Sequence, residues 1–94
     1  MLSQLPIKLD KVAGKKLDIE ILRAAIIAEL DAINLYEQFA STAEDKELAK
    51  VLLEVAREEK THVGEFQALL LKMDKEQVEE LEKGRKEVEE LAGQ

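Results

Sequence analysis

Apolar and polar positions alternate with a helical period over most of the chain. In residues 19–42 and again in residues 46–73, the residues expected to form a buried face follow one another at spacings of three and four. The first row is Leu22, Ile26, Glu29, Ile33, Tyr36 and Ala40, and the second is Leu48, Leu52, Val55, Glu59, His62, Phe66, Leu69 and Met73. Two such coiled-coil-like rows predict two long helices packed against each other.

Polar residues mark the expected ends of these helices. Asp18, Asp45 and Asp74 each precede a periodic segment, and an aspartate in this position can cap the first turn of a helix. Residues 41–45 are predicted to form the turn between the two long helices. Asp74 is followed three residues later by Gln77, a capping-box pattern that predicts a third helix over residues 75–91. Residues 18–94 therefore read as one all-α domain, an antiparallel two-helix hairpin plus a shorter C-terminal helix.

The two ends of the chain differ in pattern. Residues 1–17 contain the only proline and are expected to form an extended arm, to which we assign no role. The third helix offers a thin apolar stripe of Val78, Leu81, Val88 and Leu91, interrupted by Arg85, which suits docking on a neighbour. Two long helices bury too little apolar surface to be stable alone, so we expect a homo-oligomer.

Composition narrows the possible functions. The chain has 94 residues, no cysteine and a net charge of -7. The acidic balance disfavours nucleic acid and anionic membranes as partners, and it attracts metal cations. Without cysteine, any metal must be held by oxygen and imidazole ligands. The first residues do not resemble a signal peptide and no apolar run could span a membrane, so we expect a cytoplasmic protein.

Three residues do not fit the apolar rows. Glu29, Glu59 and His62 occupy positions where the pattern calls for apolar side chains. Residue 44, in the expected turn, is midway between residues 29 and 59, so each glutamate lies about 22 Å along its helix from the turn. The two carboxylates therefore lie at the same level of the hairpin. His62 is three residues beyond Glu59 and shares its face of the helix.

A bound cation would explain these three residues. An unpaired carboxylate buried among apolar side chains destabilises the fold by roughly several kcal/mol after relaxation. Two carboxylates at the same level also repel each other. One glutamate from one helix and Glu-x-x-His from the next make half of the di-iron constellation of four-helix bundles. If two hairpins pair about a two-fold axis, four glutamates and two histidines suit two iron or manganese ions. The alternative is that these residues form buried hydrogen bonds or salt bridges across an oligomer interface.

Two further residues lie near this level. Tyr36 is on the same row, two turns from Glu29, where it either packs at an interface or donates a hydrogen bond near the site. Asp31 adjoins the ligand positions but points off the row, so it either attracts incoming cations or belongs to a solvated face.

Residues 25–38, AIIAELDAINLYEQ, and 55–66, VAREEKTHVGEF, resemble the encapsulated ferritins, in particular the archaeal ferritin-like domain that precedes an encapsulin shell protein. The resemblance covers roughly residues 19–91. It implies a two-helix subunit that dimerises to complete a four-helix bundle and its ferroxidase centre, and that assembles into a ring-shaped decamer. Glu29, Glu59 and His62 would be the iron ligands and catalytic residues, with Glu59 bridging two irons per dimer. Tyr36 would lie near the centre and Asp31 would be an accessory.

The resemblance also implies an activity and partners. Ferrous iron would be oxidised by dioxygen or peroxide, without an organic cofactor, and passed to an encapsulin nanocompartment for iron storage. A rubrerythrin-like peroxidase is a weaker alternative, because the Cys-x-x-Cys electron-transfer module is absent. A third possibility is a non-catalytic assembly module or metal carrier, in which the glutamates and histidine only fix the register of the helices.

Overall fold

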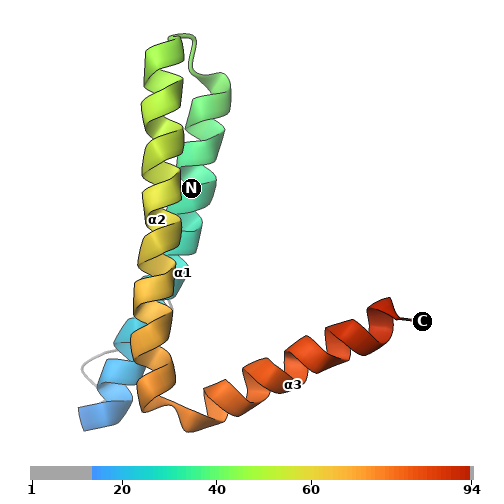
Figure 1. Ribbon diagram of the computed structural model, residues 1–94. Helices are drawn as coiled ribbons and strands as arrows, with labels where there is room; N and C mark the ends of the chain where they lie inside the picture. Colours follow the sequence, from blue (N-terminus) through green and yellow to red (C-terminus); the bar gives the residue numbers. More distant parts are fainter. Residues whose placement is uncertain (1–13, 94) are drawn as a thin grey trace.

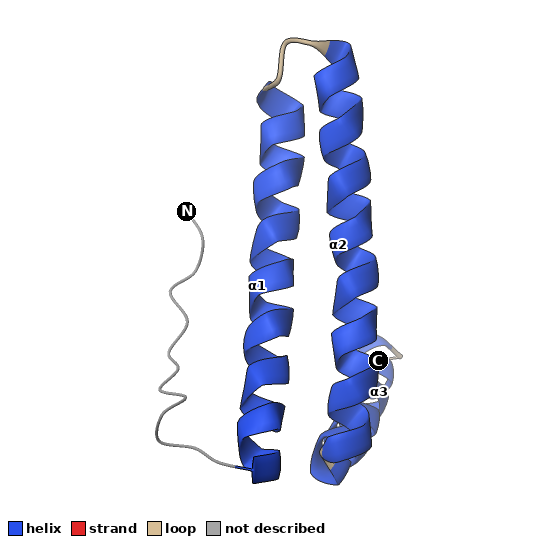
Figure 2. Ribbon diagram, turned by 90° about the vertical axis from the view of Figure 1, so that its left-hand side faces the viewer, coloured by secondary structure: helices blue, strands red, loops and turns tan. Residues whose placement is uncertain are grey.

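The computed structural model describes residues 14–93, and all three of their secondary-structure elements are helices. These are α1 (Gly14–Thr42), α2 (Lys46–Met73) and α3 (Lys75–Ala92). Helices α1 and α2 run antiparallel side by side, and α3 leaves the open end of this hairpin at a steep angle (Figure 1, Figure 2). The chain is therefore L-shaped, with extents of 46 × 45 × 20 Å. The all-helical prediction is confirmed.

The start of α1 differs from the prediction. The helix begins at Gly14 rather than at Asp18, so residues 14–17 are helical and Asp18 is not a cap. Gly14 has φ +65°, a left-handed conformation that glycine adopts without steric cost, and two lysines and a leucine, all good helix formers, follow it. The rest of the expected extended arm, residues 1–13, lies outside the described residues.

The other helix ends follow the predicted caps. An Asp45 carboxylate oxygen accepts a hydrogen bond from the backbone N–H of Leu48 at 2.8 Å, at the start of α2. Asp74 Oδ1 accepts from the backbone N–H of Gln77 at 3.1 Å, at the start of α3. Asp74 Oδ2 also accepts from Arg23 Nη2 of α1 at 2.9 Å. One aspartate therefore caps α3 and ties the elbow between α2 and α3 back to α1.

The core is a narrow layer between α1 and α2. Its buried apolar side chains, among the described residues, are Leu22, Ile33, Ala40, Ala56 and Leu70. The predicted row of α1 is confirmed, since three of its members are buried. On α2 the row is displaced, because Leu48 and Leu69 are 50% and 46% exposed while Ala56 and Leu70 face inward. None of the described helices has the length and apolar content needed to cross a membrane.

Candidate metal centre

Three parallel rows of side chains, each spaced by seven residues, run along α2 and decide where the candidate ligands lie. The most buried row is Ala49, Ala56, Val63 and Leu70. The next row, Leu52, Glu59, Phe66 and Met73, is partly buried. The third row, Leu48, Val55, His62 and Leu69, lies at the edge of the hairpin, and the His62 side chain is 45% exposed. Glu59 therefore lies inside the hairpin, and His62 lies at its rim.

Glu29 of α1 meets these two residues at the same level of the hairpin. His62 Nδ1 lies 3.2 Å from Glu29 Oε2 and 3.4 Å from Glu59 Oε2. The two glutamate side chains are only 20% and 18% exposed. One ligand atom from each of the three residues can be chosen so that all lie within 4.8 Å of one another. The structure thus brings together the three residues that the sequence singles out as metal ligands.

The spacing of these atoms suits a small divalent cation. Neighbouring oxygen or nitrogen ligands at about 2.1 Å from an octahedral ion lie about 3 Å apart, close to the 3.2 and 3.4 Å seen here. Two carboxylates and one imidazole are the ligand types that iron and manganese accept, with no thiolate available. The cluster gives an ion three ligands, so further positions remain for a second chain, water or an oxidant.

The same nitrogen of His62 faces both carboxylates. In the metal-free chain a proton on Nδ1 can be donated to a carboxylate oxygen, since a carboxylate only accepts. A bound cation would take the place of that proton, because a metal ligand must offer a lone pair. A proton and a metal ion would therefore compete for the same nitrogen of His62.

The two accessory residues, Tyr36 and Asp31, make other contacts on α1. The Tyr36 ring is half-buried and packs edge-on against Phe39, with ring centroids 6.3 Å apart and planes at 79°. Asp31 lies on a different side of α1, where it lines a surface hollow of about 220 Å³ with Asn34, Leu35 and Gln38. Within residues 14–93, Asp31 does not belong to the group of candidate ligands. Their roles near the metal stay predictions.

One contact beside the site has no signal in the sequence. Lys60, next to Glu59, forms an ion pair with Glu37 of α1, with Lys60 Nζ 3.4 Å from Glu37 Oε2. Both side chains are about half exposed, so the pair contributes about 1 kcal/mol or less. This ion pair links α1 to α2 next to the ligands. No spacing pattern in the sequence indicates that these two residues meet.

Comparison with known proteins shows the family to which the chain belongs. Residues 20–92 match the model of the family described as Rubrerythrin. The chain is 64% identical over 84 residues to the "Ferritin-like-encapsulin shell fusion protein" of Pyrococcus furiosus, in an alignment that covers 89% of this chain and 24% of that protein. The chain thus spans about a quarter of the length of that relative.

A solved structure gives the same result at the level of the fold. The crystal structure of the encapsulated ferritin domain from Pyrococcus furiosus matches with a TM-score of 0.84 at 60% identity. The match covers 100% of this chain and 98% of that one. The chain therefore belongs to the rubrerythrin family of ferritin-like proteins, and among them it groups with the encapsulated ferritins.

Proposed function

We propose that the protein is a ferroxidase, which oxidises ferrous to ferric iron at a site shared by two copies of the chain. The observation that carries this proposal is the convergence of Glu29, Glu59 and His62, with His62 Nδ1 within 3.4 Å of a carboxylate oxygen of each glutamate. Membership of a di-iron oxidoreductase family supports the same chemistry.

The rim position of His62 supports a shared site. The row that contains it is otherwise apolar, and its two end members, Leu48 and Leu69, are about half exposed in a single chain. A half-exposed apolar row with one histidine at its middle is suited to packing against a second copy. Two half-sites facing each other across a two-fold axis would supply four glutamates and two histidines, enough for two ions.

In this proposal iron is the substrate, and the protein residues bind it and adjust its charge. Two ferrous ions side by side can give up two electrons together, the number needed to reduce dioxygen to hydrogen peroxide or hydrogen peroxide to water. The carboxylates of Glu29 and Glu59 balance the added positive charge as the ions become ferric. His62 must be neutral to bind, so binding releases its Nδ1 proton where one is present.

The partners follow from the relatives. The Pyrococcus protein joins a ferritin-like part to an encapsulin shell part in one chain. We propose that this chain likewise works with an encapsulin shell, inside a nanocompartment in the cytoplasm, and supplies it with iron for storage. A homo-oligomer built from metal-binding dimers, up to a ring-shaped decamer, fits this role.

The test compares neighbouring glutamates. Glu59→Gln removes a carboxylate from the cluster without changing its size, whereas Glu58→Gln makes the same change one residue away on the exposed side of α2. Each variant is loaded with ferrous iron without oxygen and then mixed with air, while absorbance follows ferric iron. We expect Glu59→Gln to lose more than about 100-fold in rate, more than the loss of an outer-shell group costs.

The control should oxidise iron like the parent. The proposal is wrong if Glu59→Gln stays folded and oxidises iron at the parental rate. It is also wrong if the parent assembles and binds no iron, which would favour a module whose glutamates only fix register.

A further inference from the structure

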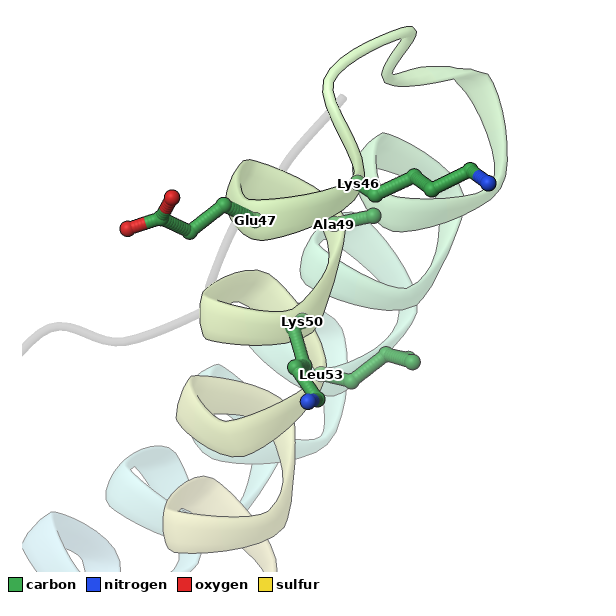
Figure 3. Close-up of a pocket in the computed structure, with 5 residues that line it drawn as sticks. All are labelled: Lys46, Glu47, Ala49, Lys50 and Leu53. Carbon is green, nitrogen blue, oxygen red and sulfur yellow. The ribbon is translucent and has the colours of Figure 1, made fainter.

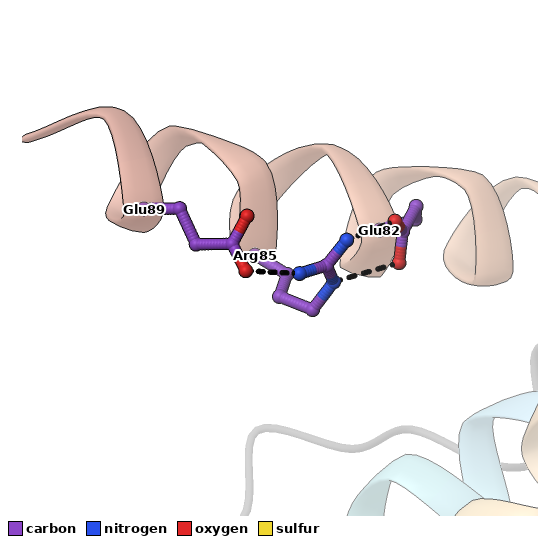
Figure 4. A network of polar contacts seen from close by, with 3 residues as sticks. All are labelled: Glu82, Arg85 and Glu89. Atoms are coloured by element: carbon purple, nitrogen blue, oxygen red, sulfur yellow. Dashed lines mark hydrogen bonds and ion pairs between the residues drawn. The ribbon is translucent and has the colours of Figure 1, made fainter. Parts of the chain in front are cut away.

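The ion pair between Lys60 of α2 and Glu37 of α1 differs from most charged contacts of residues 14–93. Lys50, which lines a shallow hollow near the loop end of α2, has no ion pair within these residues (Figure 3). Arg85 pairs with glutamates of its own helix, α3 (Figure 4), and Arg57 likewise pairs within α2. A pair within one helix cannot hold one helix against another. The pair of Lys60 and Glu37, which we call the cross-helix pair, joins the two helices that carry the candidate metal ligands.

On α1 the cross-helix pair and the metal cluster use opposite edges of the buried face. Ile33, 8% exposed, points toward α2. Glu29 is four residues before Ile33 and Glu37 is four residues after it. At about 100° per residue, the two glutamates therefore point about 40° to opposite sides of Ile33.

The same division is found on α2. Ala56 is the most buried residue of this helix, and Glu59 and Lys60 follow it by three and four residues. At about 100° per residue these two side chains also point to opposite sides of the buried face. The metal cluster therefore lies at one edge of the contact between α1 and α2, and the cross-helix pair lies at the other.

The cross-helix pair runs diagonally between the two helices. Lys60 is one residue from Glu59, about 1.5 Å along α2. Glu37 is eight residues from Glu29, about 12 Å along α1 toward the turn. Sliding one helix along the other changes the length of a diagonal contact at once, whereas it hardly changes a contact at right angles to the helices. The pair therefore restrains the register of α1 against α2.

The metal cluster depends on this register. Glu29 is its one ligand from α1, whereas Glu59 and His62 both come from α2. Any sliding of α1 therefore changes the 3.2 Å distance from Glu29 Oε2 to His62 Nδ1, while ligands must be held within about 0.5 Å. Two of the buried side chains between the helices are alanines, Ala40 and Ala56, and small side chains interdigitate less than large ones. A polar restraint on sliding thus adds to what the apolar packing supplies.

We infer that Lys60 and Glu37 are positioning residues for the metal centre, because their ion pair holds the register that brings Glu29 to its two partners on α2. The inference rests on the proposed binding of iron by this cluster. Within residues 14–93 neither positioning residue forms an ion pair with a ligand, so the pair acts through the two helices. The side chains are 60% and 46% exposed, so the effect on metal affinity should be about threefold to fivefold.

Charge reversal separates positioning from simple attraction of cations. Lys60→Glu makes the surroundings of the cluster more negative, so attraction alone would tighten metal binding, whereas loss of register weakens it. We expect Lys60→Glu and Glu37→Lys each to raise the dissociation constant of cobalt, measured by visible absorption, at least about threefold. Combining the two exchanges the charges and should restore the affinity to within about twofold of the parent.

Neutral variants provide matched controls. Lys60→Gln should raise the dissociation constant of cobalt about threefold. Arg57→Gln removes a cation two residues from Glu59 that pairs only within α2, and Lys50→Gln removes a lysine without an ion pair in residues 14–93. Both controls should bind cobalt as the parent does. At about 1 M salt the difference between Lys60→Gln and the parent should disappear, because screening weakens the ion pair.

Iron oxidation supplies a readout that a loss of stability alone would not move. Bound ions themselves hold the two helices in register, so the pair matters for binding and not for the rate once the site is filled. Lys60→Gln should raise the KM for ferrous iron about threefold and leave kcat within about twofold of the parent. Glu59→Gln, which lacks a ligand, should instead lose rate at every iron concentration.

The inference is overturned if Lys60→Glu binds cobalt as tightly as the parent or more tightly, or if exchanging the charges does not restore affinity. It is also overturned if Arg57→Gln weakens binding as much as Lys60→Gln. A further contrary result is that the variants change only the association of chains, measured by ultracentrifugation without metal. In each of these cases the parent still binds and oxidises iron, whereas the ferroxidase proposal fails where the parent itself binds none.

Discussion

The hairpin and α3 are both helical, yet they are held in place by different interactions. The hairpin buries Leu22, Ile33, Ala56 and Leu70 between its helices. Helix α3 buries none of its residues and depends on a cap and on ion pairs along its own surface. The hairpin is therefore stabilised by burial of apolar side chains, which holds its helices in one register.

This difference matches the division of tasks that we propose. A metal cluster needs ligands held within a few tenths of an ångström, and Glu29, Glu59 and His62 come from the two helices that pack against each other. Helix α3 contributes no residue to this cluster and buries none of its own, so its placement about the elbow at Asp74 need not be as exact. The tightly packed part of the chain therefore carries the proposed chemistry.

The largest expected effect separates burial in the two regions. Leu70→Ala, at a 5% exposed position in α2, should lower the free energy of unfolding by about 2–5 kcal/mol. Val88→Ala, at a 65% exposed position in α3, should change it by about 0.5 kcal/mol or less below the concentration at which chains associate. Urea unfolding followed by circular dichroism at one fixed low protein concentration measures both. Equal losses would contradict the contrast between the regions.

Metal should stabilise the hairpin and leave α3 as it is. An ion bound only by the folded chain, at 100 times its dissociation constant, adds about 2.7 kcal/mol. We expect cobalt or anaerobic ferrous iron to slow amide exchange in α1 and α2, and a chelator to reverse this. The protection should weaken in acid, because protons compete with the metal for its ligands. His62→Ala should lower the protection at neutral pH, and unchanged protection in this variant would show that His62 is not a ligand.

Much of this arrangement could be predicted from the sequence because its signals are local. The caps at Asp45 and Asp74 depend on a side chain and an N–H three residues away, and both formed as predicted. The common level of Glu29 and Glu59 followed from counting residues to the turn, and the structure brings them to one histidine. The predicted start of α1 is wrong because Asp18 has the sequence pattern of a cap, while the residues before it are good helix formers and continue the helix.

The inward row of α2 was predicted less well for a different reason. The large apolar residues Leu48 and Leu69 suggested burial, and the small Ala56 did not. In a close helix pair a small side chain lets the backbones approach, so the most buried residue of α2 is an alanine at 2% exposure. Side-chain size therefore explains why the buried row of α2 differs from the predicted row. It also explains why the sequence did not indicate that His62 lies at the rim. The elbow pair of Arg23 and Asp74 has no sequence spacing that signals it.

A smaller effect concerns the elbow that joins the two regions. Asp74→Ala removes both the cap of α3 and the contact with Arg23, so it should cost about 1 kcal/mol. Asp74→Asn keeps a capping oxygen but removes the charge, so it isolates the ion pair. Spin labels on cysteines introduced at residues 58 and 87 report the angle between α2 and α3. We expect a broader distance distribution in both variants, and more so for Asp74→Ala. An unchanged distribution in both would mean that the elbow is set by other contacts.

The smallest expected effect compares the same kind of ion pair in the two regions. Arg57 in α2 holds the pKa of Glu54 below its usual value of 4.5 by a side-chain hydrogen bond, and Arg85 in α3 does the same to the pKa of Glu82. A carboxylate whose pKa is lowered by folding contributes stability above pH 4.5, and this contribution is lost as the pH falls through the lowered pKa. Both pairs are exposed and screened, so each contribution is small.

The consequence should differ because only α2 is also held by buried residues. Between pH 6 and pH 3 we expect α3 to fray while the turn of α2 around Glu54 stays helical, as measured by carbon chemical shifts of isotope-labelled protein. Arg85→Gln should produce the fraying of α3 already at neutral pH, whereas Arg57→Gln should leave α2 unchanged. High salt should weaken both ion pairs by screening and should again affect only α3. If acid unwinds both helices together, then α2 around Glu54 depends on its surface charges as much as α3 does, and burial does not distinguish the two regions there.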